Sequence, residues 1–223
     1  MASSVLIGIL VLITSVAGTS IKKKQQTTLN RIDVNWEAPT DIKNRFMYYK
    51  SGYDYDDIPV IVMEYGNWDF QGAAEKGGKD LEIADLFIDQ LNARLLGGFF
   101  HEKSNMTDSI PVDKEIVAIV DFDGWNLSQF NSPPTLKWML DRLSKMGIIY
   151  KTISYGFIVN ANPLVYQMIN TVKPFISNFL EKVDIYGTNV NHWKTHLLKK
   201  IPPSELHPRY GGNQNFRPVS IYG

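Results

Sequence analysis

The chain has no cysteine among its 223 residues, which excludes disulfides, thiol catalysis and cysteine-ligated metal sites. It also has no excess charge of one sign, because 23 Lys and Arg residues balance 23 Asp and Glu residues. Because there is no overall basic excess to favour nucleic acid, we expect no nucleic-acid partner. Hydrophobic residues make up 44% of the chain, which is enough for the core of one domain.

A short apolar run opens the chain. Residues 5–17 are almost entirely aliphatic, and small residues continue to Ser20. A run of about 13 residues is too short to span a bilayer, and a small-residue exit is typical of a secretory cleavage site. The sequence predicts a signal peptide over residues 1–20, cleavage near Thr19 or Ser20, and secretion. Because the lysines at 22–24 follow the run, an uncleaved anchor and a non-functional leader with a cytoplasmic protein remain as alternatives.

Strands and helices alternate along the rest of the chain. Aliphatic runs predict strands near residues 58–65, 115–120, 155–159 and 183–186, and a polar turn at 54–57 predicts a hairpin. Spacings of three and four predict long helices over 81–95 and from Pro133 to Gly147, and shorter ones at 163–170 and 192–200. In the first long helix, the polar residues Glu82, Asp85, Asp89 and Asn92 are expected to face water. The alternation predicts an α/β fold with a mostly parallel sheet.

Residues 163–180 carry more large apolar side chains than one helical stripe needs. Pro174 lies near the middle of this segment and is expected to break it at Lys173-Pro174-Phe175. Two interpretations follow: two short core helices, or a broken helix that covers a ligand cavity.

Two motifs suggest catalysis. Asp121 and Asp123 leave a hydrophobic strand on the same side, as in phosphotransferases that use one aspartate as nucleophile and one as general acid. Trp125 stands where that chemistry needs a hydroxyl residue, and only Glu205 is acidic after Asp184, so structural carboxylates that accept backbone hydrogen bonds are favoured. His192 and His196 share a helix face, but without the glutamate and third ligand of a zinc protease they predict no metal site.

Several short motifs, none specific alone, occur in an order that resembles the CRAL-TRIO lipid-binding domain family, nearest to its supernatant protein factor and tocopherol-associated branch. They run from about Trp36 to Gly212: Trp36-Glu37-Ala38-Pro39, Ser51-Gly52-Tyr53-Asp54, Ile58-Pro59-Val60, Glu64-Tyr65-Gly66-Asn67-Trp68-Asp69, Asp121-Phe122-Asp123-Gly124, Asn160-Ala161-Asn162-Pro163, Lys173-Pro174-Phe175, Tyr186-Gly187 and Tyr210-Gly211-Gly212.

The resemblance implies a mixed, mostly parallel sheet that forms the floor of a lipid pocket, with a mobile gate helix at Lys173 to Lys182. The domain would span residues 36–212, between a polar linker at 21–35 and a C-terminal tail at 213–223. Asn126 and Ser128 lie where relatives meet a lipid headgroup. The lipid-contacting residues implied in this way are Val60, Val62, Ala118, Val120, Asn126, Ser128, Ile158, Leu164, Met168, Val172, Phe175, Ile176, Phe179 and Leu180.

The sequence and the resemblance together predict a monomeric, non-enzymatic carrier of one hydrophobic molecule of the tocopherol, retinoid, squalene or phospholipid class. It would need no cofactor or metal and would touch membranes transiently. Members that bind phosphatidylinositol have a Pro-Glu pair where Tyr150-Lys151 stands here, although Lys182 fits their second position. The alternatives are a Mg²⁺-dependent phosphatase that uses Asp121 and Asp123, and an interaction domain that binds no ligand.

Overall fold

The computed structural model describes residues 29, 31–101 and 114–222, apart from the side chains of residues 130–131, 143–147 and 175. The predicted leader lies outside the described residues. In chain order the elements are α3 (Thr40–Arg45), β1 (Tyr48–Tyr53), β2 (Pro59–Met63), η1 (Tyr65–Asn67), α4 (Phe70–Lys76), α5 (Gly78–Gly97), β3 (Ile116–Asp121), α6 (Ser128–Asn131), α7 (Pro133–Ile149), η2 (Tyr150–Thr152), β4 (Ile153–Val159), α8 (Pro163–Leu180), β5 (Val183–Ile185), α9 (Val190–Leu198), η3 (Pro203–Glu205), η4 (Pro208–Tyr210) and β6 (Ser220–Ile221).

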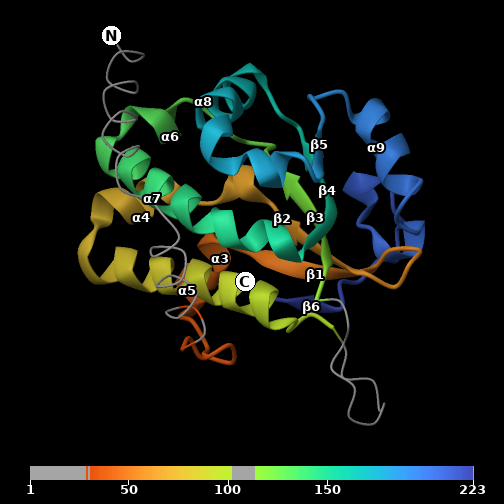
Figure 1. Ribbon diagram of the computed structural model, residues 1–223, viewed down its shortest axis with the longest axis horizontal. Coiled ribbons are helices and arrows are strands. Elements are labelled where there is room, and N and C mark those ends of the chain that lie inside the picture. The colour runs from red at the N-terminus through yellow and green to blue at the C-terminus, as the bar shows by residue number, and fades with distance from the viewer. Residues whose placement is uncertain (1–28, 30, 102–113, 223) are drawn as a thin grey trace.

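One six-stranded sheet organises the described residues, in the order β5-β4-β3-β2-β1-β6 (Figure 1). Strands β2 to β5 pair in parallel, whereas β1 is antiparallel to both β2 and β6. The α/β fold class with a mixed, mostly parallel sheet is therefore confirmed. Strand β6 was not predicted, because it comes from residues interpreted as a C-terminal tail, where Ile221 pairs with Tyr49.

The predicted hairpin turn joins β1 and β2 and is held by one carboxylate. Asp54 Oδ1 accepts hydrogen bonds from the backbone N–H groups of Asp56 (2.9 Å) and Ile58 (2.8 Å). Asp57 takes the left-handed conformation, with φ of 61°, a backbone conformation that aspartate adopts more readily than most residues.

Both long amphipathic helices form, as α5 and α7. Helix α7 does not end at the predicted Gly147 but continues to Ile149. A glycine inside a helix costs only about 1 kcal/mol, and burial of Ile148 and Ile149 offsets this cost.

Helix α8 is bent after Pro174. Because proline has no N–H to donate to the preceding turn, one backbone hydrogen bond of α8 is missing there. Ile176 departs from helical geometry, with φ of −120° and ψ of 19°. The break was predicted at residues 173–175, and the structure places it at Ile176. The first part of α8 also extends beyond the predicted residues 163–170.

The two faces of the sheet support separate cores. Helices α5, α7 and α8 lie over one face, and α9 with η3 and η4 lies against the other (Figure 1). No helix in the described ranges combines the length and the apolar character that a membrane crossing requires. The position of each strand residue, odd or even, decides which core its side chain joins.

Candidate functional site

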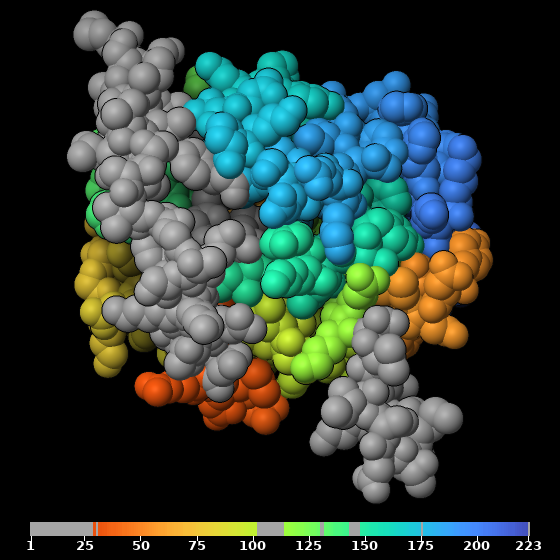
Figure 2. Space-filling model, in the orientation of Figure 1, coloured from red at the N-terminus to blue at the C-terminus, as the bar shows by residue number. Residues whose placement is uncertain are grey.

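An apolar cavity of about 140 Å³ lies between the sheet and helices α5, α7 and α8. Helix α8 packs on α7 above it, and the two segments meet at the surface in Figure 2. The residues that line the cavity are Met63, Tyr65, Trp68, Phe70, Ile88, Leu91, Asn92, Leu95, Ala118, Val120, Phe122, Met139, Arg142, Ile149, Ile153, Ile158, Met168, Ile169, Val172, Ile176 and Phe179.

Half of the sequence-predicted lipid contacts lie in the wall of this cavity. The sheet contributes Ala118, Val120 and Ile158, whose positions match across β3 and β4 because Val120 pairs with Ile158. The bent helix contributes Met168, Val172, Ile176 and Phe179. Their spacing of four, four and three places them on one face of α8, directed at the sheet.

Val60 and Val62 are not in the wall, and this part of the prediction is corrected. Both are fully buried in the core on the other face of the sheet. In the β2–β3 register, Ile61 pairs with Ala118 and Met63 with Val120, so the odd-numbered residues of β2 lie on the cavity side of the sheet, where Met63 lines the cavity. Side chains alternate along a strand, and a continuous apolar run does not reveal which parity faces a ligand.

The other predicted residues have different positions. Asn126 and Ser128 are exposed at the start of α6, where Asn126 Oδ1 accepts hydrogen bonds from the Ser128 N–H (2.9 Å) and hydroxyl (2.6 Å). Neither residue lines the cavity, and nor do the half-buried Leu164 and Leu180. The side chain of Phe175 lies outside the described ones.

Aromatic rings build one end of the cavity. The ring of Tyr65 lies 4.8 Å from Phe70, 5.0 Å from Trp68 and 5.2 Å from Phe122, centroid to centroid. Trp68 Nε1 donates to the carbonyl of Met47 at 2.9 Å. Rings in edge or tilted contact stabilise each other beyond the effect of the apolar area that they bury. This end of the cavity is therefore well packed.

Three of the lining residues carry polar groups that sequence reasoning missed: Tyr65, Asn92 and Arg142. The expectation that Asp89 and Asn92 face water is wrong, because both are buried, whereas Glu82 is exposed as predicted. Arg142 of α7 explains the burial of Asp89: its Nη1 donates to Asp89 Oδ1 at 2.7 Å. In the sequence, the only sign of this buried polar face is the spacing of Asp85, Asp89 and Asn92, which places the three residues on one side of the helix.

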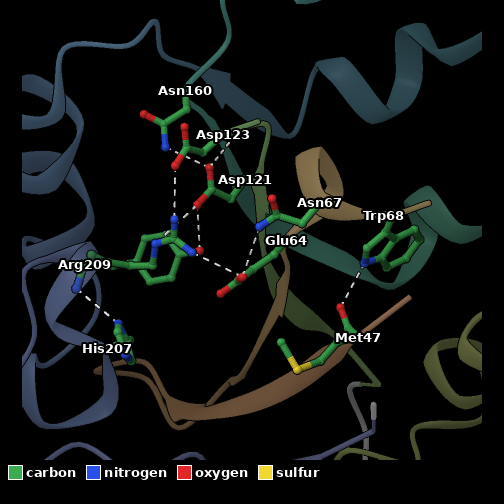
Figure 3. A network of polar contacts seen from close by, with 10 residues as sticks. Met47, Glu64, Asn67, Trp68, Asp121, Asp123, Asn160, His207 and Arg209 are labelled. Atoms are coloured by element: carbon green, nitrogen blue, oxygen red, sulfur yellow. Dashed lines mark hydrogen bonds and ion pairs between the residues drawn. The ribbon is translucent and has the colours of Figure 1, made fainter. Parts of the chain in front are cut away.

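Asp121 belongs to a separate polar network at the carboxyl end of β3 (Figure 3). Its Oδ1 accepts from Asn160 Nδ2 (2.7 Å) and from the Asp123 N–H (2.9 Å). Its Oδ2 accepts from the Tyr210 hydroxyl at 2.8 Å, and burial, reinforced by the Asp121 charge, raises the pKa of that tyrosine. Asp121 is 2% exposed, so this carboxylate ties β3, β4 and the C-terminal segment together, and nothing supports the phosphatase alternative.

Arg209 completes the network from the C-terminal side. Its guanidinium lies 3.1 Å from Glu64 Oε2 and 3.1 Å from Asp123 Oδ2, with Nε 3.9 Å from Asp121 Oδ2 (Figure 3). Both aspartates therefore face Arg209, with Asp121 buried and Asp123 in an exposed ion pair. The structural interpretation of the Asp-x-Asp-Gly motif accounts for both side chains.

The histidine pair of α9 makes edge and tilted ring contacts with Tyr186. His192 and His196 have ring centroids 5.1 Å apart, and both contact the ring of Tyr186. Within the described part of the chain, no three His, Cys, Asp or Glu side chains come together as metal ligands would.

The fold and the cavity define a class of protein: an α/β domain with an apolar cavity beneath helices. The CRAL/TRIO domain model matches residues 43–212, and the chain belongs to this family, whose domain implies binding of a lipophilic ligand. Among solved structures, a chain described as the crystal structure of Sfh5 superposes with a TM-score of 0.55 at 12% sequence identity. The match covers 86% of this chain and 64% of that one, and at this identity it supports the fold alone.

Proposed function

We propose that this protein carries one lipid-like molecule in the cavity between the sheet and helices α5, α7 and α8. The single observation that carries this proposal is a cavity in which 18 of the 21 lining residues are apolar. Each 100 Å² of apolar ligand surface removed from water contributes about 2.5 kcal/mol. A chamber of this kind therefore supplies affinity without any catalytic group.

The bend in α8 supports a gate over residues 173–182. A cavity of about 140 Å³ is comparable with an apolar cavity of about 150 Å³ that admits benzene, so a tocopherol, retinoid, squalene or phospholipid molecule needs more room. Ile176 sits at the bend and lines the cavity together with Phe179. Movement of the segment after the bend would enlarge the chamber and open it to a ligand.

The ligand class is proposed from this wall and from the resemblance to the tocopherol-associated branch. Phosphoinositides fit less well. Lys151 is exposed on η2, where phosphatidylinositol binders have a carboxylate. Lys182 donates to the carbonyl of Ile153 and lies 4.0 Å from Glu115, so its charge is already engaged.

Exchange with a membrane follows from the same gate. When the gate swings outward, the cavity side of α8 becomes an apolar surface that would rest on the bilayer during ligand transfer. The proposal includes a monomeric carrier and a secreted mature chain, which amino-terminal sequencing of protein from secretory cells would test.

A paired substitution tests the gate and the carrier function together. Phe179→Asp places a charge on the gate, and Phe157→Asp places the same charge in the core on the opposite face of the sheet. Because a gate can turn the charge to water, Phe179→Asp should lower the unfolding temperature less than its control. Transfer of a fluorescent tocopherol between vesicles should fall at least about tenfold for this variant.

The contrary result is equally clear. If Phe179→Asp unfolds as easily as Phe157→Asp while transfer per folded molecule is unchanged, residues 173–182 are ordinary core and the proposed gate is wrong.

A further inference from the structure

Two polar side chains face the apolar cavity with hydrogen-bonding capacity that the described residues leave unused. Asn92 of α5 is 8% exposed and lines the cavity. Its side-chain amide has no hydrogen-bond partner within the described part of the chain. A carboxamide carries two donor hydrogens and one acceptor oxygen, and burying it without a partner is unfavourable.

Arg142 of α7 is the second. It is 6% exposed, and its Nη1 bonds to Asp89 Oδ1 (2.7 Å) and to the carbonyl of Asp85 (3.3 Å). Its Nη2 forms an ion pair with the Asp85 carboxylate. Its Nε–H is buried and has no partner among the described residues.

The spacing of residues along α5 brings the two groups towards the same part of the cavity wall. Asp85, Asp89 and Asn92 are four and three residues apart on α5, so they share one helix face. Arg142 reaches the first two, and Asn92 lies one turn further along. Tyr65 lines the same cavity. Burial raises the pKa of its hydroxyl, and the charge of Arg142 acts against this rise. The Tyr65 hydroxyl is therefore a third polar group that interacts electrostatically with Arg142.

We propose that Arg142 and Asn92 bind the hydroxyl group of the lipid, so that this carrier selects a neutral alcohol or phenol over a pure hydrocarbon and over an anionic lipid. This inference rests on the proposed carrier function. The oxygen of the ligand hydroxyl would accept a hydrogen bond from Arg142 Nε–H, and the hydroxyl hydrogen would be donated to Asn92 Oδ1. One hydroxyl group can therefore bond to both side chains.

The ion pairs of Arg142 explain the choice of a neutral ligand. The guanidinium already pairs with Asp85 and Asp89, so its charge is matched before any ligand enters. A fatty-acid carboxylate would be desolvated and brought towards two other carboxylates, whereas a hydroxyl costs less to bury and needs no counter-charge.

Three probes that differ only at one end separate these possibilities: dodecane, 1-dodecanol and dodecanoate. Binding to the full chain is followed by tryptophan fluorescence, because Trp68 lines the cavity. Asn92→Leu removes the amide at similar volume, and Arg142→Lys keeps the charge for the two aspartates while it removes Nε–H. Asn191→Leu makes the first change at an exposed position of α9 and serves as the control.

The wild-type protein and Asn191→Leu should bind dodecanol at least about tenfold more tightly than dodecane or dodecanoate. Asn92→Leu should lose this preference and keep its affinity for dodecane. Arg142→Lys should behave in the same way, and Asn92→Leu alone decides the question if that variant unfolds.

Three results would overturn the inference. If the wild-type protein binds all three probes equally, or dodecanoate most tightly, the carrier function stands and the hydroxyl site is wrong. If Asn92→Leu keeps the full preference for dodecanol, these residues do not form the site. Failure of every probe to bind the wild-type protein would overturn the carrier function and the inference together.

Discussion

The two faces of the sheet are both apolar, yet they are packed differently. On the face covered by α9, the side chains of Val62, Ile119, Leu197 and Tyr210 are completely buried and form a closed core. On the other face, the corresponding layer of β2 to β4 and α8 surrounds a cavity. One face of the sheet therefore forms a closed stabilising core, and the other leaves space for a ligand.

The largest expected effect comes from the same truncation on both faces. Ile119→Ala removes a side chain that is 0% exposed in the closed core and should cost about 2–5 kcal/mol of unfolding free energy. Ile158→Ala, at 4% exposed in the cavity wall, should cost about half as much, because that side chain already lacks contacts on one side. Urea unfolding of both variants makes the measurement, and equal losses would remove the distinction between the faces.

The polar network on the closed side gives the next effect. The two carboxylate oxygens of Asp121 accept hydrogen bonds from Asn160 and Tyr210. Asp121→Asn replaces one of these oxygens by an NH₂ group, which can only donate. It should cost about 2–3 kcal/mol of unfolding free energy. Ligand affinity should stay within about tenfold of wild type, because Asp121 lies outside the cavity wall.

This variant also tests catalysis. The purified wild-type protein should not hydrolyse a phosphomonoester in the presence of Mg²⁺. A phosphatase activity that disappears in Asp121→Asn would contradict the carrier function.

The smallest effect concerns the edge of the helical layer. Hydrogen bonds from Lys76 and then from Arg45 hold the pKa of Asp80 below its usual value. Because the pKa of Asp80 is lower in the folded state, its ionisation stabilises the protein at a pH above the unfolded-state pKa of about 4. This stabilisation is lost as the pH falls through the folded-state pKa. Wild type should therefore exceed Asp80→Asn in stability at neutral pH, and the difference should shrink as the pH falls through the folded-state pKa of Asp80. A difference that is constant with pH would contradict this origin.

Much of the fold could be predicted from the sequence. The long helices and the parallel strands follow from apolar spacing, which burial enforces directly. Strand β6 could not be predicted, because two residues are too few for a pattern and form a strand only when β1 offers a free edge.

The cavity wall was harder to predict, for two physical reasons. Strand β2 is buried on both faces, so Val60 and Val62 carry the same apolar signal as Ile61 and Met63. Polar residues on an amphipathic helix ordinarily face water, and the burial of Asp89 depends on where α7 places Arg142. Such partners come from tertiary packing, which one sequence pattern does not contain.

Native mass spectrometry of the purified chain shows whether the cavity beneath α8 holds a lipid. Ala118 lies on β3 in the cavity wall, so Ala118→Val and Ala118→Phe fill the space in steps without touching the closed core. Wild type should retain one extractable lipid per chain, with less in Ala118→Val and almost none in Ala118→Phe, although both variants unfold cooperatively. A wild-type chain that carries and takes up no lipid, or a folded Ala118→Phe that retains a full complement, would contradict lipid binding in this cavity.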